Sequence, residues 1–142
     1  MKKVNKILVV GIWSMLAGSV NQAALATTPD ELLKEYEASA KKANKSFKEF
    51  SAEAGKKFFL AEMTNKKGET VSCATCHTQD PKQKGKTRAG KAIEPMAPSV
   101  NKERFTDKAK VEKWFKRNCK DVYERECTAQ EKGDFIAFMK SL

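Results

Sequence analysis

Histidine is almost absent from this chain of 142 residues, in which His77 is the only one. Any site that needs two histidines from the same chain is therefore excluded. Cysteine is scarce as well, with four residues in all. No segment alternates apolar and polar residues as a half-buried strand does, and no internal repeat is visible. Neither a sheet-based domain nor a repeat array is expected.

Long apolar runs are also lacking, apart from Ile7–Val20 near the N-terminus. A lysine-rich start precedes this run and Ala24-Leu25-Ala26 follows it, which is the pattern of a secretory signal peptide. The run is too short for a membrane span, and an uncleaved N-terminal anchor is the alternative. We expect residues 1–26 to be a signal peptide and residues 27–142 to be one small periplasmic domain, with no stable membrane insertion after cleavage.

The clearest chemical pattern is Cys73-Ala74-Thr75-Cys76-His77. Two thiols three positions apart can each add to a vinyl group of the same haem, and the histidine that follows can bind the iron. The motif predicts one covalently bound haem c with His77 as the proximal ligand. Export agrees with this, because c-type haem is usually attached outside the cytoplasm, where disulfides also persist.

Two other interpretations of a C-x-x-C pair compete with haem. A zinc site needs a second pair of Cys or His ligands, but Cys119 and Cys127 have seven residues between them and no histidine nearby. A thioredoxin-type pair lies between a strand and a helix, and nothing in residues 60–90 alternates like a strand. Both are weaker predictions than haem attachment.

Helical signals open the mature chain. Thr28-Pro29-Asp30-Glu31 combines a capping hydroxyl, a proline at the first helical position and acids in the first turn. Helical composition continues to about Met63, with a break near Asn44. Gly55 in the second part is expected to serve close packing. The apolar stripe around it, at helical spacing, consists of Phe47, Phe50, Ala54, Phe58 and Phe59.

Two more helices are expected downstream. Thr106 should cap the first, and the capping box Thr128-Ala129-Gln130-Glu131 should begin the terminal one. Residues 78–104 contain three prolines and two glycines and are expected to form a long loop around the haem edge. The inward stripe of the first of these helices consists of Val111, Trp114, Phe115 and Asn118, and that of the terminal helix of Phe135, Ile136, Phe138 and Met139.

The predicted fold class is all-α, with helices packed around one covalently bound haem. A domain of about 116 residues buries only around two-thirds of its unfolded surface, so its own core is thin. The apolar haem ring completes that core. The aromatic residues expected to pack around it are Phe47, Phe58, Phe59, Trp114, Phe115, Phe135 and Phe138.

The ligand on the other side of the iron cannot be a second histidine of this chain. A methionine, Asn118, a lysine or an open position remain. Met96 lies only 19 residues after His77, where packing at the haem edge is favoured. Asn118 lies on an apolar stripe, where a buried amide needs a partner, although asparagine is also common where a helix ends.

The remaining cysteines, Cys119 and Cys127, would normally pair in an exported protein. Because the loop between them is short, chain entropy would give the disulfide a stabilisation of roughly 2.5 kcal/mol. The link would also restrain the backbone beside Asn118. A functional clamp and a plain structural link both fit.

Several segments resemble known cytochromes. The attachment motif, with Gly55 and Phe59 before it and an aromatic terminal helix, resembles class I c-type cytochromes. The downstream half is similar to a narrower family, the asparagine-ligated monohaem cytochromes known as sphaeroides haem protein (SHP), whereas residues before about 54 match nothing specific. The matching segments are Glu94–Asn101, Arg104–Asp107, Val111–Cys119, Arg125–Thr128 and Glu131–Asp134.

The resemblance implies that the asparagine leaves the iron on reduction and that small diatomic molecules such as O2, NO and CO then bind. It also implies a dihaem cytochrome c, or a similar redox protein, as electron donor. The site residues that it implies are Cys73 and Cys76 for the haem thioethers, His77 as proximal ligand, Asn118 as distal ligand in the oxidised state, and Cys119 with Cys127 as a disulfide.

Three functions compete at this point. The leading one is a redox-gated haem protein that binds or reduces O2, NO or peroxide. The second is a plain electron carrier whose sixth site is closed by Met96. The third is an enzyme proper, an oxygen, NO or peroxide reductase, although no second histidine is present for acid–base work and only Arg88, Arg104 or a lysine could assist.

Basic residues are in excess, with a net charge of +10, of which three lysines lie in residues 1–26 and leave about +7. A basic exported domain can meet an acidic redox partner or an anionic membrane surface, and export argues against nucleic acid. One basic run could dock an acidic electron donor, pair with haem propionates or simply be solvated. It consists of Lys82, Lys84, Lys86, Arg88 and Lys91.

Overall fold

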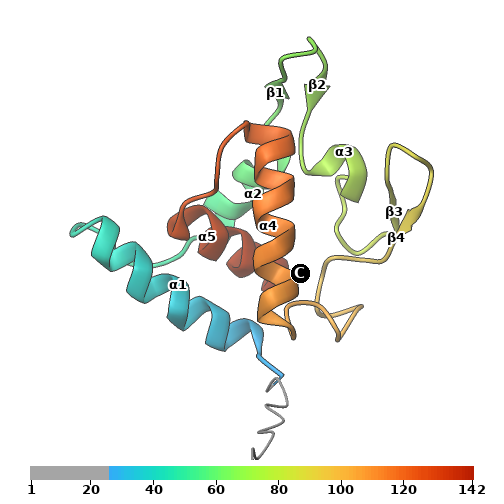
Figure 1. Ribbon diagram of the computed structural model, residues 1–142. Helices are drawn as coiled ribbons and strands as arrows, with labels where there is room; N and C mark the ends of the chain where they lie inside the picture. The colour runs from blue at the N-terminus through green and yellow to red at the C-terminus, as the bar shows by residue number, and fades with distance from the viewer. Residues whose placement is uncertain (1–25) are drawn as a thin grey trace, which may run out of the picture.

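Helices provide most of the regular structure of residues 26–142, the part of the chain that the computed structural model describes (Figure 1). The predicted signal peptide lies outside this part, except for Ala26. The helices are α1 Pro29–Ala43, α2 Ala52–Leu60, α3 Ala74–His77, α4 Lys108–Tyr123 and α5 Ala129–Lys140. The all-α fold class is confirmed. Within residues 26–142, no helix has the length and apolar character that crossing a membrane requires.

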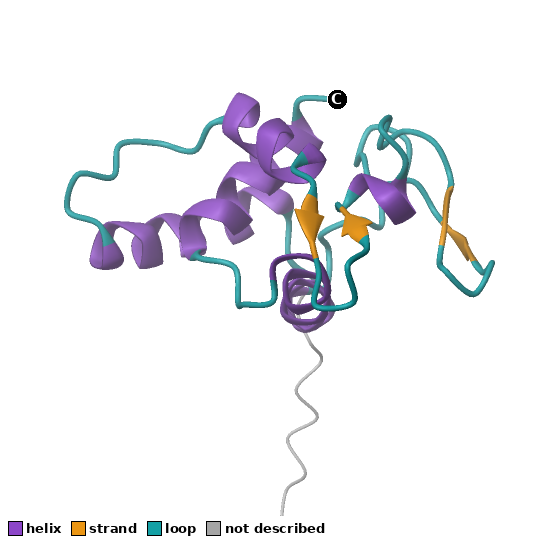
Figure 2. Ribbon diagram, turned by 90° about the horizontal axis from the view of Figure 1, so that it is seen from above, coloured by secondary structure: helices purple, strands orange, loops and turns teal. Residues whose placement is uncertain are grey.

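Four strands of two residues each form two small antiparallel hairpins that we did not expect. β1 (Met63–Thr64) pairs with β2 (Thr70–Val71), and β3 (Gly85–Lys86) pairs with β4 (Ala92–Ile93). Strands this short cannot show the alternation by which a sequence reveals a strand. The short helix α3 lies between the two hairpins (Figures 1 and 2).

Capping boxes begin α1 and α5, as predicted. The side chain of Thr28 accepts a hydrogen bond from the N–H of Glu31 at 3.2 Å, and the Glu31 carboxylate accepts one from the N–H of Thr28 at 2.7 Å. Thr128 and Glu131 form the same reciprocal pair. Each pair satisfies backbone donors that a helix N-terminus otherwise leaves without partners.

Helix α4 begins one residue later than expected. Asp107 is the capping residue, because its carboxylate accepts a hydrogen bond from the N–H of Lys110 at 2.9 Å. The Thr106 hydroxyl instead donates to the carbonyl oxygen of Glu103. The helix then continues to Tyr123. Asn118 is therefore inside α4, and the alternative in which it ends the helix is wrong.

The segment between α1 and α2 is longer than the predicted break at Asn44. Phe47 and Phe50 lie outside any helix, because α2 begins only after Ser51, whose side chain accepts a hydrogen bond from the N–H of Ala54. The two phenylalanine rings lie edge to face, with centroids 5.1 Å apart. A side chain on Gly133 of α5 would collide with the Phe50 ring. Contact with α5, rather than helical spacing, thus decides where Phe50 lies.

Helices α2 and α5 cross at Gly55, as the prediction of close packing required. A Cβ atom at this position would collide with the backbone carbonyl of Asp134. Asp134 is itself buried, and its carboxylate accepts a hydrogen bond from the N–H of Ser51 at 2.8 Å. The crossing therefore joins the N-terminus of α2 to the middle of α5.

The core gathers where α1, α2, α4 and α5 meet. Its fully buried side chains are Leu32, Phe59, Ile136 and Met139. Phe115, Phe135 and Phe138 are buried beside them, whereas the expected core residue Trp114 is 45% exposed. The reason is that Trp114 lies on the flank of α4, beside the face that Phe115 and Cys119 bury.

Helix α4 separates the two sides of the molecule. Helix α1 lies on one side of it, and α3 with the β3–β4 hairpin lies on the other (Figures 1 and 2). Residues presented by α4 toward α3 are therefore shielded from α1. This arrangement positions the candidate site.

Candidate haem site

The turn of helix α3 brings together the three residues of the predicted attachment site. Cys73 precedes the helix, and its carbonyl oxygen accepts a hydrogen bond from the N–H of His77 at 3.1 Å. Ser72 and Thr75 close the turn through reciprocal hydrogen bonds, the N–H of Ser72 donating to the Thr75 hydroxyl at 2.8 Å. Neither Cys73 nor Cys76 forms a disulfide among residues 26–142. One helical turn thus holds two thiols and an imidazole, as haem attachment requires.

The chain changes direction immediately after His77. Thr78 has a φ of 62° and a ψ of 167°, a backbone conformation that a β-branched residue adopts only under strain. Its hydroxyl donates to the carbonyl oxygen of Asp80 at 2.7 Å. The chain then returns to α3, because Gly85 lies so close to the carbonyl of Cys76 that a Cβ atom would collide with it. Strain and close packing together hold the turn that presents His77.

The imidazole of His77 lacks a partner. Its Nδ1 atom is buried and has no hydrogen bond to any described residue. Burial, with a smaller contribution from the positive charge of Arg104, lowers the pKa of His77 to about 4. The ring is therefore neutral near pH 7, and a neutral ring is the form that binds a metal. A neutral imidazole binds iron through one ring nitrogen and leaves the other to be satisfied by its surroundings, so the neutral, buried ring of His77 fits a metal ligand.

Arg104 is a residue whose place beside His77 our functional assignment from sequence missed, although it was named as a possible assistant in an enzyme. Its guanidinium donates to the carbonyl oxygens of Pro95, at 2.7 Å, and Glu94. Arg104 thereby joins residues of the loop before α4. Its guanidinium lies close enough to His77 for its positive charge to act on the imidazole. The sequence signals were its basic side chain and its place in a segment that resembles SHP.

Tyr123, at the end of α4, is a second residue that we missed. Its hydroxyl donates to the carbonyl oxygen of Phe58, and its ring stacks on that of Phe58 with centroids 4.6 Å apart. It also lies beside the Cys73 thiol, whose pKa burial raises to about 11 while Tyr123 lowers it in part. The C-terminal end of α4 is thus in contact with the attachment turn.

Asn118 lies five residues before Tyr123 in the same helix and is partly buried. Among residues 26–142, the Asn118 amide is not one of the buried polar atoms left without a hydrogen-bond partner, so it is accessible to solvent or to a ligand. It shares the flank of α4 with Trp114, one turn away, which carries exposed apolar surface. A polar amide and an exposed aromatic ring on one flank of α4 fit a helix face that would contact a large apolar group such as haem.

Cys119 and Cys127 come together at the other edge of the same helix. Their Cα atoms are 5.7 Å apart, the separation that a disulfide needs. Both side chains are buried. The sequence spacing and this approach agree with the predicted disulfide, whose formation in the protein stays a prediction.

Met96 is held in the loop between β4 and α4. Its N–H donates to the carbonyl oxygen of Pro81 at 2.8 Å, and its side chain is partly buried against the core. That contact agrees with the packing role favoured for it. A zinc site has no support in the described residues, because no three or more His, Cys, Asp and Glu side chains are grouped there to hold a metal ion.

Known proteins share this arrangement. A family model described as a domain of unknown function (DUF1924) matches residues 45–139. The chain is 45% identical over 113 residues to the cytochrome c-type protein SHP of Cereibacter sphaeroides, which covers 80% of this chain and 83% of that protein. The chain belongs to the SHP family of c-type cytochromes. It is also 38% identical over 122 residues to cytochrome c'' of Methylophilus methylotrophus, and the match covers 85% of each chain.

Solved structures agree with this SHP-family fold. The structure of oxidised SHP, described as an oxygen-binding cytochrome c, superposes with a TM-score of 0.74 at 44% identity and covers 82% of this chain and 99% of that one. Oxidised cytochrome c'' gives a TM-score of 0.73 at 38% identity, with 78% and 91% covered. The chain is therefore a monohaem-type cytochrome, and the Cys73–His77 motif is interpreted as its haem attachment site. Helix α1 precedes the residues that the family model matches.

Proposed function

We propose that the mature chain is an exported, periplasmic monohaem cytochrome c that accepts electrons and, when reduced, opens its sixth iron site to small ligands such as O2, NO or peroxide. The observation that carries this proposal is Asn118, a partly buried amide inside α4 on the same flank as the exposed ring of Trp114. The relative SHP is described as an oxygen-binding cytochrome c. A solution structure of cytochrome c'' is described in terms of haem-ligand detachment.

The proposed site uses residues from two parts of the fold. Cys73 and Cys76 carry the thioether bonds of one haem c, and His77 binds the iron from the proximal side. Asn118 binds from the distal side in the oxidised protein. The disulfide between Cys119 and Cys127 restrains the helix beside that ligand.

The chemistry of the amide explains the redox gating. Haem supplies an iron that exchanges one electron and binds two axial ligands. The oxygen of Asn118 is a hard, neutral donor that suits ferric iron better than ferrous iron. Reduction therefore weakens the hold of Asn118, and a small ligand can take its place. Whether the bound ligand is then reduced decides between a binding protein and an oxygen, NO or peroxide reductase.

A plain electron carrier with Met96 as a closed sixth ligand is the competing function. A thioether stabilises the ferrous state, so Met96 would hold the reduced iron and exclude small ligands. The packing of Met96 against the core favours the first proposal. On reduction, the first function predicts that the sixth iron site opens to small ligands, and the second predicts that it stays closed.

The proposed electron donor is a dihaem cytochrome c or a similar redox protein. Lys82, Lys86 and Lys91 are exposed on and around the β3–β4 hairpin. Lys84 and Arg88 of the same basic run form ion pairs with Glu94 and Glu69. The three unpaired lysines, beside α3, would meet an acidic surface of the donor.

The optical spectrum tests the proposal. The purified holoprotein and an Asn118→Ala variant are measured oxidised, reduced with dithionite, and reduced under carbon monoxide. We expect a high-spin ferrous form that binds carbon monoxide at once, and an oxidised spectrum that changes in the variant. A low-spin ferrous form indifferent to carbon monoxide, with the variant unchanged, would establish the carrier with Met96 instead.

A further inference from the structure

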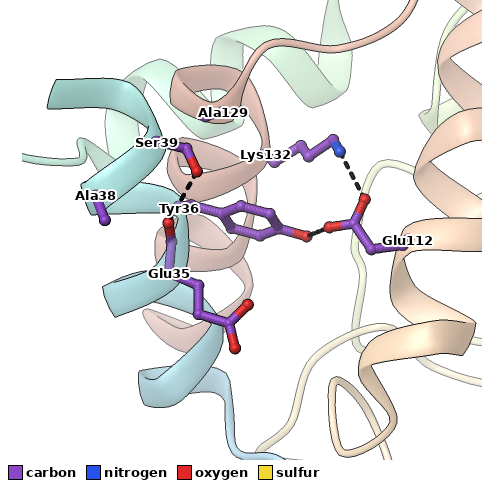
Figure 3. A pocket seen from close by; sticks show the side chains of 7 residues that line it. All are labelled: Glu35, Tyr36, Ala38, Ser39, Glu112, Ala129 and Lys132. Atoms are coloured by element: carbon purple, nitrogen blue, oxygen red, sulfur yellow. Dashed lines mark hydrogen bonds and ion pairs between the residues drawn. The ribbon is translucent and has the colours of Figure 1, made fainter. Parts of the chain in front are cut away.

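A hollow of about 500 Å³ separates the middle of α1 from the start of α4 (Figure 3). Helix α1 lies on the side of α4 away from α3 (Figure 1). The Tyr36 ring crosses the hollow, and its hydroxyl donates a hydrogen bond to one carboxylate oxygen of Glu112. Lys132 of α5 donates to the other oxygen at 2.7 Å. The residues that line it are Glu35, Tyr36, Ala38, Ser39, Glu112, Ala129 and Lys132.

These three side chains form one connected group, which we call the Tyr36–Glu112–Lys132 network. The ammonium group of Lys132 lies 5.6 Å from the centroid of the Tyr36 ring and 5.8 Å from that of Phe115. Phe115 in turn packs edge to face on Tyr36 and on Phe135. A cation, an anion and two rings thus fix α4 to α1 and α5 at one place.

The charges of the network are well defined. Burial, followed by the hydrogen bond with Glu112, raises the pKa of Tyr36 above its usual range, so the phenol is neutral. Burial also tends to raise the pKa of Glu112, but the hydrogen bonds from Lys132 and Tyr36 outweigh it and leave that pKa lowered. Glu112 is therefore an anion held by two donors from two other helices.

Helix α4 is consequently held at both ends, with Asn118 between them. The network and the ion pair from Lys108 to Glu35 hold its first turns against α1. At its last turn, Tyr123 is hydrogen-bonded to Phe58 of α2. Asn118 lies six residues after Glu112, about 9 Å along the helix axis. Any tilt of the first turns would therefore move Asn118.

We propose that Tyr36 and Glu112 are positioning residues that set how firmly Asn118 holds the ferric iron. The inference rests on the proposed function, since it takes Asn118 as the distal ligand. Both side chains lie on the α1 side of α4 (Figure 3), whereas the attachment turn in α3 lies on the other side of that helix (Figure 1). They act by keeping α4 in the position from which the Asn118 amide reaches the iron.

The direction in which the spin state and the reduction potential should change follows from which oxidation state Asn118 stabilises. Loosening α4 weakens the Asn118 bond in the ferric protein, so the high-spin ferric fraction rises. Lost ferric stabilisation also raises the reduction potential. A tenfold weakening of the bond corresponds to an upward shift of about 59 mV for a one-electron couple.

The test uses the holoprotein and two conservative substitutions. Tyr36→Phe removes one hydroxyl and keeps the ring, and Glu112→Gln removes the charge and keeps the shape. The control is Leu32→Ala, which damages the packing of the same helix α1 at a fully buried position and removes no hydrogen bond or charge of the network. Ferric spin state, from the optical and electron paramagnetic resonance spectra, and reduction potential are measured for each variant, alone and combined with Asn118→Ala.

Tyr36→Phe and Glu112→Gln should each raise the high-spin fraction and the potential when Asn118 is present, and should change neither in the Asn118→Ala background. Leu32→Ala should lower thermal stability with little change in either quantity. Equal shifts with and without Asn118, or shifts as large in Leu32→Ala, would overturn the positioning role. An oxidised spectrum that Asn118→Ala leaves unchanged would instead overturn the proposed ligand, and the inference with it.

Discussion

Gly55 of α2 lies directly against the backbone carbonyl of Asp134 in α5, so the two helices cross with no side chain between them. The contact explains why a residue that weakens helices stands in the middle of α2. In an open helix, alanine would be more stable than glycine by about 1 kcal/mol. At this crossing the added methyl group has no space.

Gly55→Ala should therefore destabilise the protein by about 1–3 kcal/mol, the usual cost of overpacking a core. Urea unfolding followed by circular dichroism measures the loss. Lys56→Ala, at an exposed position of the same helix, should change stability by less than about 0.5 kcal/mol. A Gly55→Ala protein as stable as the parent would show that α2 and α5 are not in contact here.

Glu131 makes stability depend on pH. The hydrogen bond from Arg125, with those of Thr128, lowers the pKa of Glu131 below its ordinary value of 4.5 despite partial burial. A lowered carboxyl pKa contributes stability that is present above the ordinary pKa and lost as pH falls through the lowered one. Glu131→Gln should therefore be less stable than the parent at pH 7, and the difference should vanish in strong acid.

Urea midpoints of the parent and Glu131→Gln, measured from pH 7 down to pH 2, check this expectation. Glu103→Gln is a suitable control, because Glu103 is exposed and its side chain makes no hydrogen bond or ion pair among residues 26–142. A gap between parent and Glu131→Gln that is unchanged across the range would contradict the assignment of Glu131.

Cys119 and Cys127 should be linked in the purified protein. Alkylation without prior reduction should leave both unmodified, as mass spectrometry of peptides can show. Replacing both by serine should cost roughly 2.5 kcal/mol of unfolding free energy, because a short loop closed by a disulfide restricts the unfolded chain. Two alkylated thiols in protein isolated without reductant would contradict the link.

Charge at the β3–β4 hairpin should govern the rate of reduction by a dihaem cytochrome c. The rate should fall steeply as ionic strength rises, because salt screens attraction between exposed charges. The triple variant Lys82→Glu, Lys86→Glu, Lys91→Glu should be reduced more slowly and lose most of the salt dependence.

A control with the same change in net charge separates local docking from overall attraction. Lys34→Glu, Lys42→Glu, Lys45→Glu reverses exposed lysines on and after α1, on the opposite side of α4. That variant should retain most of the rate. Equal losses of reduction rate in both triple variants would contradict a docking surface at the hairpin. A parental rate that is independent of ionic strength would contradict it as well.

Non-local packing accounts for the expectations that were wrong. Phe47 and Phe50 continue a helical spacing in the sequence, but Phe50 packs against Gly133, about 80 residues away. For Phe50, a contact distant in sequence outweighed the local pattern. Trp114 is exposed on the flank of α4, and its predicted contact with the haem stays a prediction.

The sequence by itself determined what depends on neighbours along the chain: the attachment motif Cys73–His77, the capping boxes at Thr28 and Thr128, and the all-α class. Caps and covalent motifs act within a few residues, so they are visible without a fold. Only the tertiary structure placed Arg104 beside His77 and joined Tyr36 to Glu112 and Lys132. Burial brings such charges and hydrogen bonds together across distant segments, and no local pattern records which helices will meet.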